Sequence, residues 1–366
     1  MSHWFNRYLR LDWPLMFAVL SLTSISLLAI YGINISRGDD FFQFKKQLLA
    51  VALGSVLVLG LAWLDYRQIR SLSLPIYVAG LVLLVASLFL GTTSHGGGRW
   101  FIIGALSFQP VEIAKITLAI FLAAYLGRQS HNRLSWATFL GSGLAAGVYV
   151  ALTLAQPDFG SGMVLVAIWL ACVLFCGLPR HAWWILILSV SAVALLTWNF
   201  GLRPYQRDRI MSFVNPTLDP YGASYNVAQA RIAVGSGGLW GKGIGEGSQA
   251  RLRFLPEAST DFMFAVLGEE LGFIGLGLVL AFFGLLLSRF VVIGQEAGDA
   301  FAGILLIGLG AMIAFHLLIN AGMNLGIMPV TGIPLPFLSA AASSVVAMFL
   351  AVGLAQSVAV HGGKRS

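Results

Sequence analysis

The stretch FLPEASTDFMFAVLGEELGFIGLGLVLAFFGLLLS (residues 254–288) places two acids just ahead of one of the most apolar runs in the chain. From residue 262 onward the run is long enough to cross a bilayer as a helix, which needs about 20 apolar residues. The rest of the chain is similar, because 58% of the 366 residues are hydrophobic, 10% are charged and the mean hydropathy is +0.85. A soluble protein of this length could not bury so much apolar surface, so the sequence predicts an all-α integral membrane protein.

Apolar segments of suitable length predict about ten transmembrane helices, with a long extracytoplasmic loop at about 201–261 before the eighth. The helices are expected near residues 14–35, 46–64, 74–91, 110–128, 136–156, 161–178, 183–200, 262–288, 299–323 and 337–360. No internal repeat and no separate soluble domain is visible. Residues 1–366 are therefore predicted to form a single polytopic membrane domain.

Basic residues in the short loops indicate how these helices are oriented. If ten helices alternate in direction, one face collects Arg7, Arg10, Arg67, Arg70, Arg128, Arg133, Arg180, Arg289, Lys364 and Arg365. The positive-inside rule assigns that face, and with it both termini, to the cytoplasm. The long loop before the eighth helix is also basic, but long loops are exempt from the rule. With a net charge of +7 and no nucleic-acid-binding motif, the chain is expected to bind anionic lipid headgroups or diphosphates.

The segment QPVEIAK (residues 109–115) begins the fourth apolar run and carries two opposite charges. Glu112 and Lys115 are three residues apart, so they can pair along one face of a helix. Charged groups inside a membrane usually face the bundle interior or a polar cavity. The pair is interpreted either as a structural ion pair near the interface or as part of a functional site.

Two further motifs place charges at the predicted outer face. In AQPDFGSG (residues 155–162), Asp158 could cap the next helix, or it could hold a cation or orient a neighbouring group. In GGGRWFIIG (residues 96–104), Arg99 could extend its charge to the interface or bind a phosphate of an anionic lipid.

The glycine-rich segment GSGGLWGKG (residues 235–243) matches neither common nucleotide-binding pattern. Ser236 and Gly243 stand where a P-loop requires glycine and a hydroxyl residue, and Trp240 replaces the third glycine of the dinucleotide pattern. Two interpretations remain. The segment is either a plain surface loop, or it offers backbone N–H groups and Lys242 to phosphate oxygens.

The segment NAGMNLGIMPVTGIPLPFLSAAASS (residues 320–344) contains three prolines within a short distance. Irregular backbone near membrane depth is tolerated only where protein or a water-filled cavity shields it. We therefore expect a re-entrant or cavity-lining segment, with a simple outer loop as the alternative.

Asp261, at the start of the eighth apolar run, has two interpretations. Its carboxylate could cap the helix, or it could act as a base that accepts a proton from a hydroxyl group. Glu257, four residues earlier, is either a second acid or a group that stabilises the loop.

Taken together, these segments resemble the SEDS family of shape, elongation, division and sporulation proteins. The resemblance is carried by YQRDRIMSFVNPTLDPYGASYNVAQARIAVGSGGLWGKGIGEGSQARLRFLPEASTDFMFAVLGEELG (residues 205–272), and by GGGRWFIIGALSFQPVEIAKI, AQPDFGSG and NAGMNLGIMPVTGIPLPFLS. These motifs follow the family's order along the chain. Within the family, GSGGLWGKG and FLPE are more similar to the RodA branch than to the FtsW branch.

The resemblance implies a peptidoglycan glycosyltransferase in the bacterial cytoplasmic membrane, with its active face extracytoplasmic. Such an enzyme joins lipid II disaccharides into β-1,4 glycan strands during cell wall elongation and shape maintenance, and it releases undecaprenyl diphosphate. The implied partners are lipid II, the nascent glycan strand, membrane lipids and a class B penicillin-binding protein that acts as the transpeptidase. Two alternatives remain: a flippase or transporter of lipid II, and a noncatalytic scaffold for a penicillin-binding protein.

The resemblance also implies roles for particular residues. The family's essential aspartate, in its Pro-Glu-x-x-Thr-Asp-Phe motif, falls on Asp261, the expected general base. Its Glu-x-x-Lys pair falls on Glu112 and Lys115, and the aspartate of its Gln-Pro-Asp motif falls on Asp158. Glu112 and Lys115 are expected to be catalytic together with Asp261. Residues expected to bind substrate are Arg99, Asp158, Arg207, Arg209, Lys242, Glu257 and Thr260. A divalent cation, Mg²⁺ or Mn²⁺, held partly by Asp158, could help to bind the diphosphate.

The sequence departs from the family pattern at two places. Val111 stands where the family commonly has serine, next to the charged pair. SAAASS (residues 339–344) stands where the family has Ser-Tyr-Gly-Gly-Ser-Ser, and alanine restricts the backbone more than glycine does.

Overall fold

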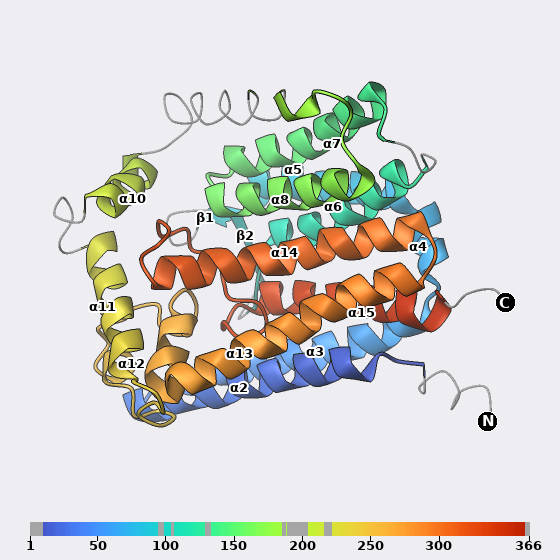
Figure 1. Cartoon of the computed structure of the whole chain (residues 1–366). Helices are drawn as coiled ribbons and strands as arrows, with labels where there is room; N and C mark the ends of the chain where they lie inside the picture. Colours follow the sequence, from blue (N-terminus) through green and yellow to red (C-terminus); the bar gives the residue numbers. More distant parts are fainter. Residues whose placement is uncertain are drawn as a thin grey trace.

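The computed structural model describes residues 10–93, 99–103, 106–128, 133–184, 188, 204–215 and 222–362, and it is a bundle of long helices (Figure 1). In this part of the chain, eight helices are long and apolar enough to cross a membrane: α2 (Trp13–Arg37), α3 (Phe42–Trp63), α5 (Ser73–Leu90), α7 (Trp136–Ala155), α8 (Phe159–Cys176), α13 (Met263–Glu296), α14 (Ala300–Asn324) and α15 (Ala342–His361). The predicted helical membrane architecture is confirmed.

Two of the ten predicted spans, the fourth and the seventh, are not among these eight helices. The fourth corresponds to α6 (Pro110–Leu126), which has 17 residues and is buried along almost its whole length. Seventeen residues are at the short end of what can cross a bilayer. The seventh, predicted at 183–200, lies almost entirely outside the described residues, so the count of ten stays a prediction.

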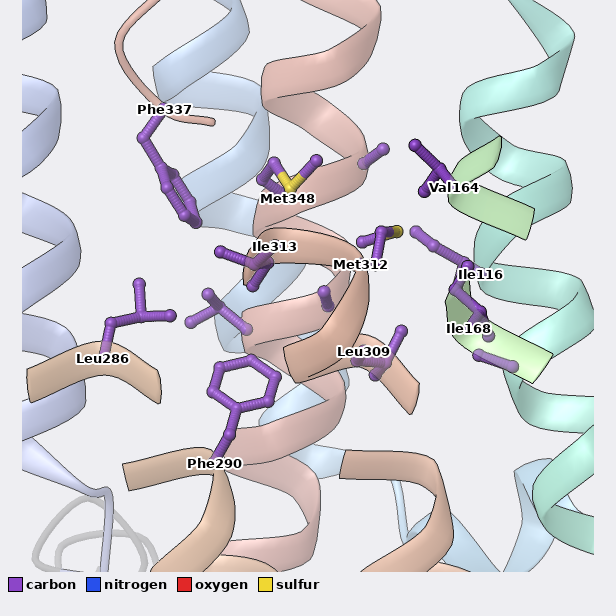
Figure 2. Close-up of a cluster of buried hydrophobic side chains, with 14 of the residues drawn as sticks. Ile116, Val164, Ile168, Leu286, Phe290, Leu309, Met312, Ile313, Phe337 and Met348 are labelled. Carbon is purple, nitrogen blue, oxygen red and sulfur yellow. The ribbon is translucent and has the colours of Figure 1, made fainter. Parts of the chain in front are cut away.

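Helix α14 is packed on several sides by other helices, namely α6, α8, α13 and α15. Figure 2 shows the buried apolar side chains that meet around it, among them Ile116, Val164, Ile168, Leu286, Phe290, Leu309, Met312, Ile313, Phe337 and Met348. A small residue permits one close approach, because a Cβ atom at Gly308 would lie 2.8 Å from the sulfur of Cys172 on α8. Interhelical packing of this kind fixes α14 relative to the rest of the bundle.

The beginning of α2 and the last turns of α15 lie at the same end of the bundle. The N–H group of Asp12 donates to Gln356 Oε1 (2.9 Å), and Gln356 Nε2 donates to the Asp12 carbonyl (3.0 Å). The Asp12 carboxylate caps α2 and also pairs with Arg289 of α13. The short helix α4 (Tyr66–Ser71) lies at this end too, away from α10–α12 (Figure 1). Arg67, Arg70 and Arg289, three of the basic residues predicted to share one face, therefore lie at the same end of the bundle.

The segment between α5 and α6 forms a small antiparallel sheet that the prediction did not include. Its strands are β1 (Thr92–Thr93), β2 (Arg99–Ile103) and β3 (Leu106–Phe108), with Phe101 opposite Phe108 and Ile102 opposite Ser107. Aromatic and β-branched residues dominate β2, and these residue types favour strands. The sheet directly precedes the first turn of α6 in the chain.

The long connection before α13 is also more regular than a loop. It contains α10 (Pro204–Val214), α11 (Ala223–Ser236) and the short α12 (Ser248–Arg251). These three helices lie at the end of the bundle opposite α4 (Figure 1).

Helix α13 is interrupted at Gly272, whose φ of 69° and ψ of −169° are not helical. At this break the carbonyl groups of Glu269 and Glu270 accept hydrogen bonds from the N–H groups of Lys242 and Gly243. The N–H groups of the two residues that follow the break donate to carbonyl groups of the same glycine-rich turn. The eighth predicted span is thus two helical pieces joined through residues 238–243.

Candidate active site

Segments that were predicted to share the outer face meet in a pocket of about 940 Å³. Its walls come from the first turns of α3 and α6, from β2 and β3, from the start of α8 and from α10. His316 and Ile319 of α14 also line it, as do residues in the segments 257–261, 328–334 and 340–344. The prediction that the proline-rich segment before α15 lines a cavity is confirmed. A volume of this size is at the upper end of typical small-molecule sites, which span roughly 300–1,000 Å³.

A buried ion pair forms part of the pocket wall. Helix α6 begins with Pro110 and has Glu112 in its first turn, where a proline and an acid both favour helix initiation. Lys115 Nζ lies 2.8 Å from Glu112 Oε1, and both residues are about 1% exposed. The predicted pairing is therefore confirmed. The second oxygen, Glu112 Oε2, is buried and has no hydrogen-bond partner among the described residues.

His316 of α14 is the third member of this group. Its Nε2 atom lies 3.1 Å from Lys115 Nζ, and its Nδ1 atom lies 3.2 Å from the carbonyl oxygen of Pro334. Since Lys115 donates, we assign the ring proton to Nδ1, which then donates to Pro334. The ion pair is thereby connected to the proline-rich segment that lines the pocket.

Asp261 lines the pocket at the end of the segment that leads into α13. Its backbone carbonyl accepts hydrogen bonds from Asn320 Nδ2 (3.0 Å) and Asn324 Nδ2 (3.1 Å), both buried on α14. Asn320 also donates to the carbonyl of Ile333 at 2.8 Å. The carboxylate lies beside Gly332, where a Cβ atom would be 3.6 Å from Asp261 Oδ2. Two asparagines therefore hold Asp261 against the proline-rich segment.

Asp261 does not occupy the N-cap position of α13. Helix α13 begins at Met263, and Phe262, whose side chain makes no capping hydrogen bond, occupies the N-cap position. A side chain of α14 caps the first turn from outside, because Asn324 Oδ1 accepts a hydrogen bond from the N–H group of Ala265 at 3.2 Å.

Glu257 and Thr260 both line the pocket and form a hydrogen bond with each other. Thr260 Oγ1 donates to Glu257 Oε2 at 3.0 Å, which joins the two ends of this turn. Ser259 within the turn donates to Gln43 Oε1 of α3 at 2.7 Å. Glu257 thus stabilises its own loop, as one of the two interpretations expected.

The alanine-rich departure at 339–344 is accommodated without backbone strain. The N–H group of Ala340 donates to the carbonyl of Ser259 at 2.7 Å, and Ser339 Oγ donates to the carbonyl of Thr260. None of residues 340–342 has a positive φ, so the restriction that alanine imposes is not felt there. All three alanines line the pocket next to the turn that carries Asp261.

Asp158 joins the starts of two helices. Its Oδ1 atom accepts from the N–H group of Ser161 (2.9 Å) and caps α8, while its Oδ2 atom accepts from Gln109 Nε2 (3.1 Å), just before α6. The capping interpretation is confirmed, and the carboxylate also lines the pocket. Among the described residues, no three His, Cys, Asp or Glu side chains are grouped so that they could hold a metal ion.

The arginines expected to bind substrate occupy different positions. Arg209 of α10 lines the pocket, whereas Arg207, two residues earlier, is not part of the lining. Arg99 of β2 donates from Nη1 to the carbonyl of Gly91 at 2.9 Å and also lies outside the lining.

Lys242 is committed to a structural role. Its Nζ atom lies 2.7 Å from the buried Glu269 Oε1 and 2.8 Å from Ser236 Oγ. The backbone N–H group of Lys242 is used as well, because it donates to a carbonyl at the break in α13. The glycine-rich segment therefore stabilises α13, and the structure does not place its lysine in the pocket.

The sequence motifs did not single out His316 or Lys46, and no role was predicted for Asn320 or Asn324. His316, Asn320 and Asn324 are spaced four residues apart in an apolar run, which places them on one helix face. Polar residues inside a membrane segment are functional candidates, so this spacing was a usable signal. Lys46 lay at the start of a predicted span and was not singled out, although it lines the pocket.

The structure defines a class of protein: a polytopic helical membrane protein with a pocket lined by acidic and basic side chains at one end of its bundle. The chain belongs to the family of FtsW, RodA and SpoVE, described as "Cell cycle protein", which it matches over residues 12–364. This confirms the resemblance found in its sequence motifs.

Curated relatives are similar over nearly their whole length. The peptidoglycan glycosyltransferase MrdB of Escherichia coli (strain K12) is 33% identical over 354 residues, which cover 96% of this chain and 94% of MrdB. The stage V sporulation protein E of Bacillus subtilis (strain 168) is 35% identical over 359 residues, covering 95% of this chain and 96% of that protein.

Solved structures show the same fold. A chain of a peptidoglycan synthase complex that coordinates polymerization and crosslinking superimposes with a TM-score of 0.79 at 30% identity, covering 95% of this chain and 97% of that one. The rod shape-determining protein RodA of Thermus thermophilus superimposes with a TM-score of 0.71 at 29% identity, covering 95% of this chain and 96% of RodA.

Proposed function

We propose that this chain is a peptidoglycan glycosyltransferase that joins lipid II disaccharides into β-1,4 glycan strands and releases undecaprenyl diphosphate. The observation that carries the proposal is the shared pocket of Asp261 and the Glu112–Lys115 pair. Relatives with a third of their residues identical are named peptidoglycan glycosyltransferases, which supports the same activity here.

Asp261 is the proposed general base. As the 4-hydroxyl oxygen of the acceptor sugar forms a bond to the anomeric carbon of the donor, Asp261 accepts the hydroxyl proton. The bond between that carbon and the diphosphate breaks, and its electron pair leaves with undecaprenyl diphosphate. Attack from the face opposite the α-linked diphosphate yields a β linkage, so the configuration inverts. The hold of Asn320 and Asn324 on the Asp261 backbone keeps the base in place.

The buried pair has a complementary role in this proposal. Lys115 and Arg209 line the pocket and provide positive charge for the departing diphosphate. Glu112 holds the ammonium group of Lys115 in place at 2.8 Å. Thr260 and Glu257 border the same space.

The pocket residues do not fit a metal ion held by protein ligands alone. Glu112 is paired with Lys115, and both oxygens of Asp158 accept hydrogen bonds from the protein. No three suitable side chains are grouped within the described residues. The steps proposed above therefore use only side chains of the chain itself.

The proposed setting is the outer face of the bacterial cytoplasmic membrane, with both termini in the cytoplasm. A class B penicillin-binding protein is the proposed transpeptidase partner, which the likeness to a complex that couples polymerization and crosslinking supports. The likeness to RodA supports a role in cell elongation and shape maintenance.

Reconstitution tests the activity directly. The purified protein is placed in liposomes with lipid II, with and without its class B partner, and the products are separated by gel electrophoresis. We expect glycan polymer that a muramidase digests. Movement of lipid II across the bilayer without polymer formation would indicate a flippase. Polymer that forms equally well without this chain would indicate that the chain is a scaffold.

A further inference from the structure

Lys46 is a pocket cation to which neither the motifs nor the comparisons assign a role. It lies in the second turn of α3, is half-buried, and lines the pocket. Its Nζ atom donates a hydrogen bond to Ser107 Oγ of β3 at 2.7 Å. The contact fixes the direction of the side chain toward the sheet that precedes α6.

The charge of Lys46 has no acidic counterpart within the described part of the chain. Lys115 forms an ion pair with Glu112, and Lys242 forms one with Glu269. Lys46 forms no ion pair there, and its hydrogen bond goes to a neutral hydroxyl group. A cation that is partly withdrawn from water without a carboxylate is stabilised when an anion enters beside it.

The position of Lys46 relates it to both halves of the proposed active site. Gln43, one turn earlier on α3, accepts a hydrogen bond from Ser259, two residues before Asp261. Ser107, the partner of Lys46, lies in the strand that leads into α6 and its Glu112–Lys115 pair. Helix α3 therefore places this ammonium group between the segment that carries the base and the segment that carries the buried pair.

We propose that Lys46 binds the diphosphate of the polyprenyl-linked donor, an inference that rests on the proposed glycosyltransferase activity for its choice of ligand. The ammonium group donates to a diphosphate oxygen and stabilises the negative charge that grows as the sugar–oxygen bond breaks. It keeps its proton throughout, because the hydroxyl proton goes to Asp261.

Three variants separate the charge of Lys46 from its bulk. Lys46→Met removes the charge and keeps a long unbranched side chain, whereas Lys46→Arg keeps the charge. Lys45→Met is the matched control, because Lys45 is the adjacent lysine, is exposed, and is not part of the pocket lining. Thermal melting of each purified variant checks that the bundle is intact.

The first measurement is binding of undecaprenyl diphosphate to the protein in nanodiscs of neutral lipid. Hydrogen bonds to charged groups support a loss of about tenfold to hundredfold in affinity for Lys46→Met. We expect Lys46→Arg and Lys45→Met to bind like the unmodified protein. Inorganic pyrophosphate and phosphatidylglycerol serve as competitors. Displacement by phosphatidylglycerol at equal charge would overturn the assignment to a diphosphate in favour of a general site for anionic lipid.

The second measurement is polymer formation from lipid II, which we expect Lys46→Met to reduce and Lys46→Arg largely to retain. Unchanged binding and unchanged polymer in a folded Lys46→Met protein would overturn the inference while leaving the proposed function intact. Binding that depends on Lys46 in a protein that makes no polymer would sustain the diphosphate site and remove the proposed function instead.

Discussion

Lys115 is held by two partners of different chemistry, and this arrangement shapes the pocket at the scale of single residues. Glu112 supplies a negative charge at 2.8 Å, while His316 supplies a neutral nitrogen at 3.1 Å. Withdrawing an ion pair from water is costly, and the pair persists only with good geometry and further hydrogen bonds. His316 provides one of these, and through Pro334 it also positions the opposite wall.

Single and double substitutions of the pair should separate stability from activity. Glu112→Gln leaves Lys115 buried without a counter-charge, which typically destabilises a protein by about 3–5 kcal/mol. The double variant Glu112→Gln/Lys115→Met removes both charges, so it should recover most of the stability but remain inactive. Chemical denaturation in detergent and the polymerisation assay check the two expectations. A double variant that polymerises lipid II normally would show that the pair is only structural.

The break in α13 is the main feature at the scale of secondary-structure elements. Gly272 has a positive φ and lies so close to the glycine-rich turn that a Cβ atom would be 2.3 Å from the backbone nitrogen of Gly241. The glycine-rich turn forms hydrogen bonds with backbone groups on both sides of the break, and Lys242 pairs with the buried Glu269. Because the short first piece of α13 follows Asp261 directly, this joint helps to set the position of the proposed base.

Two glycines of α13 provide a matched test of this joint. Gly272→Ala forces a side chain into a left-handed conformation and against backbone, so we expect a loss of about 1–3 kcal/mol or more. Gly277→Ala lies in the same helix with no atom within 4 Å of the added carbon, and we expect a gain of about 0.5–1 kcal/mol. Melting curves of the two variants measure these changes in stability. Equal stability would mean that the break is not required.

The sequence predicted the positions of most helices, but it predicted fewer of the contacts between them. Long apolar runs located the helices, and the three-residue spacing of Glu112 and Lys115 was enough to predict their pairing. The break at Gly272 was not predicted, because glycine is also common inside membrane helices. The roles of His316 and Lys46 depend on partners more than 60 residues away, and local spacing does not reveal such contacts.

At the scale of the whole molecule, the two ends of the bundle differ in character. One end holds the start of α2, the last turns of α15 and the arginines of α4, while the other holds the pocket and α10–α12 (Figure 1). The alternating direction of the helices predicted this division. In the structure, segments assigned to one face do meet in the pocket. The positive-inside rule predicts that the end with the arginines of α4 faces the cytoplasm.

Cysteine labelling tests the orientation. In a background with Cys172 and Cys176 replaced, single cysteines are introduced at Arg67 and at Trp240, both exposed at opposite ends of the bundle. A membrane-impermeant maleimide should label position 240 in intact spheroplasts and position 67 only after permeabilisation. The reverse pattern would place the pocket on the cytoplasmic side and contradict the proposed reaction.

The most direct test of the central claim is the rate of lipid II polymerisation by Asp261→Asn, which keeps the size of the side chain and removes its basicity. General-base catalysis contributes about 10²–10⁴-fold, so we expect polymer formation to fall at least a hundredfold while lipid II binding and melting temperature are unchanged. Glu246→Gln, an exposed acid outside the pocket lining, is the control and should polymerise normally. Polymerisation by a folded Asp261→Asn protein at the unmodified rate would contradict the assignment of Asp261 as the base.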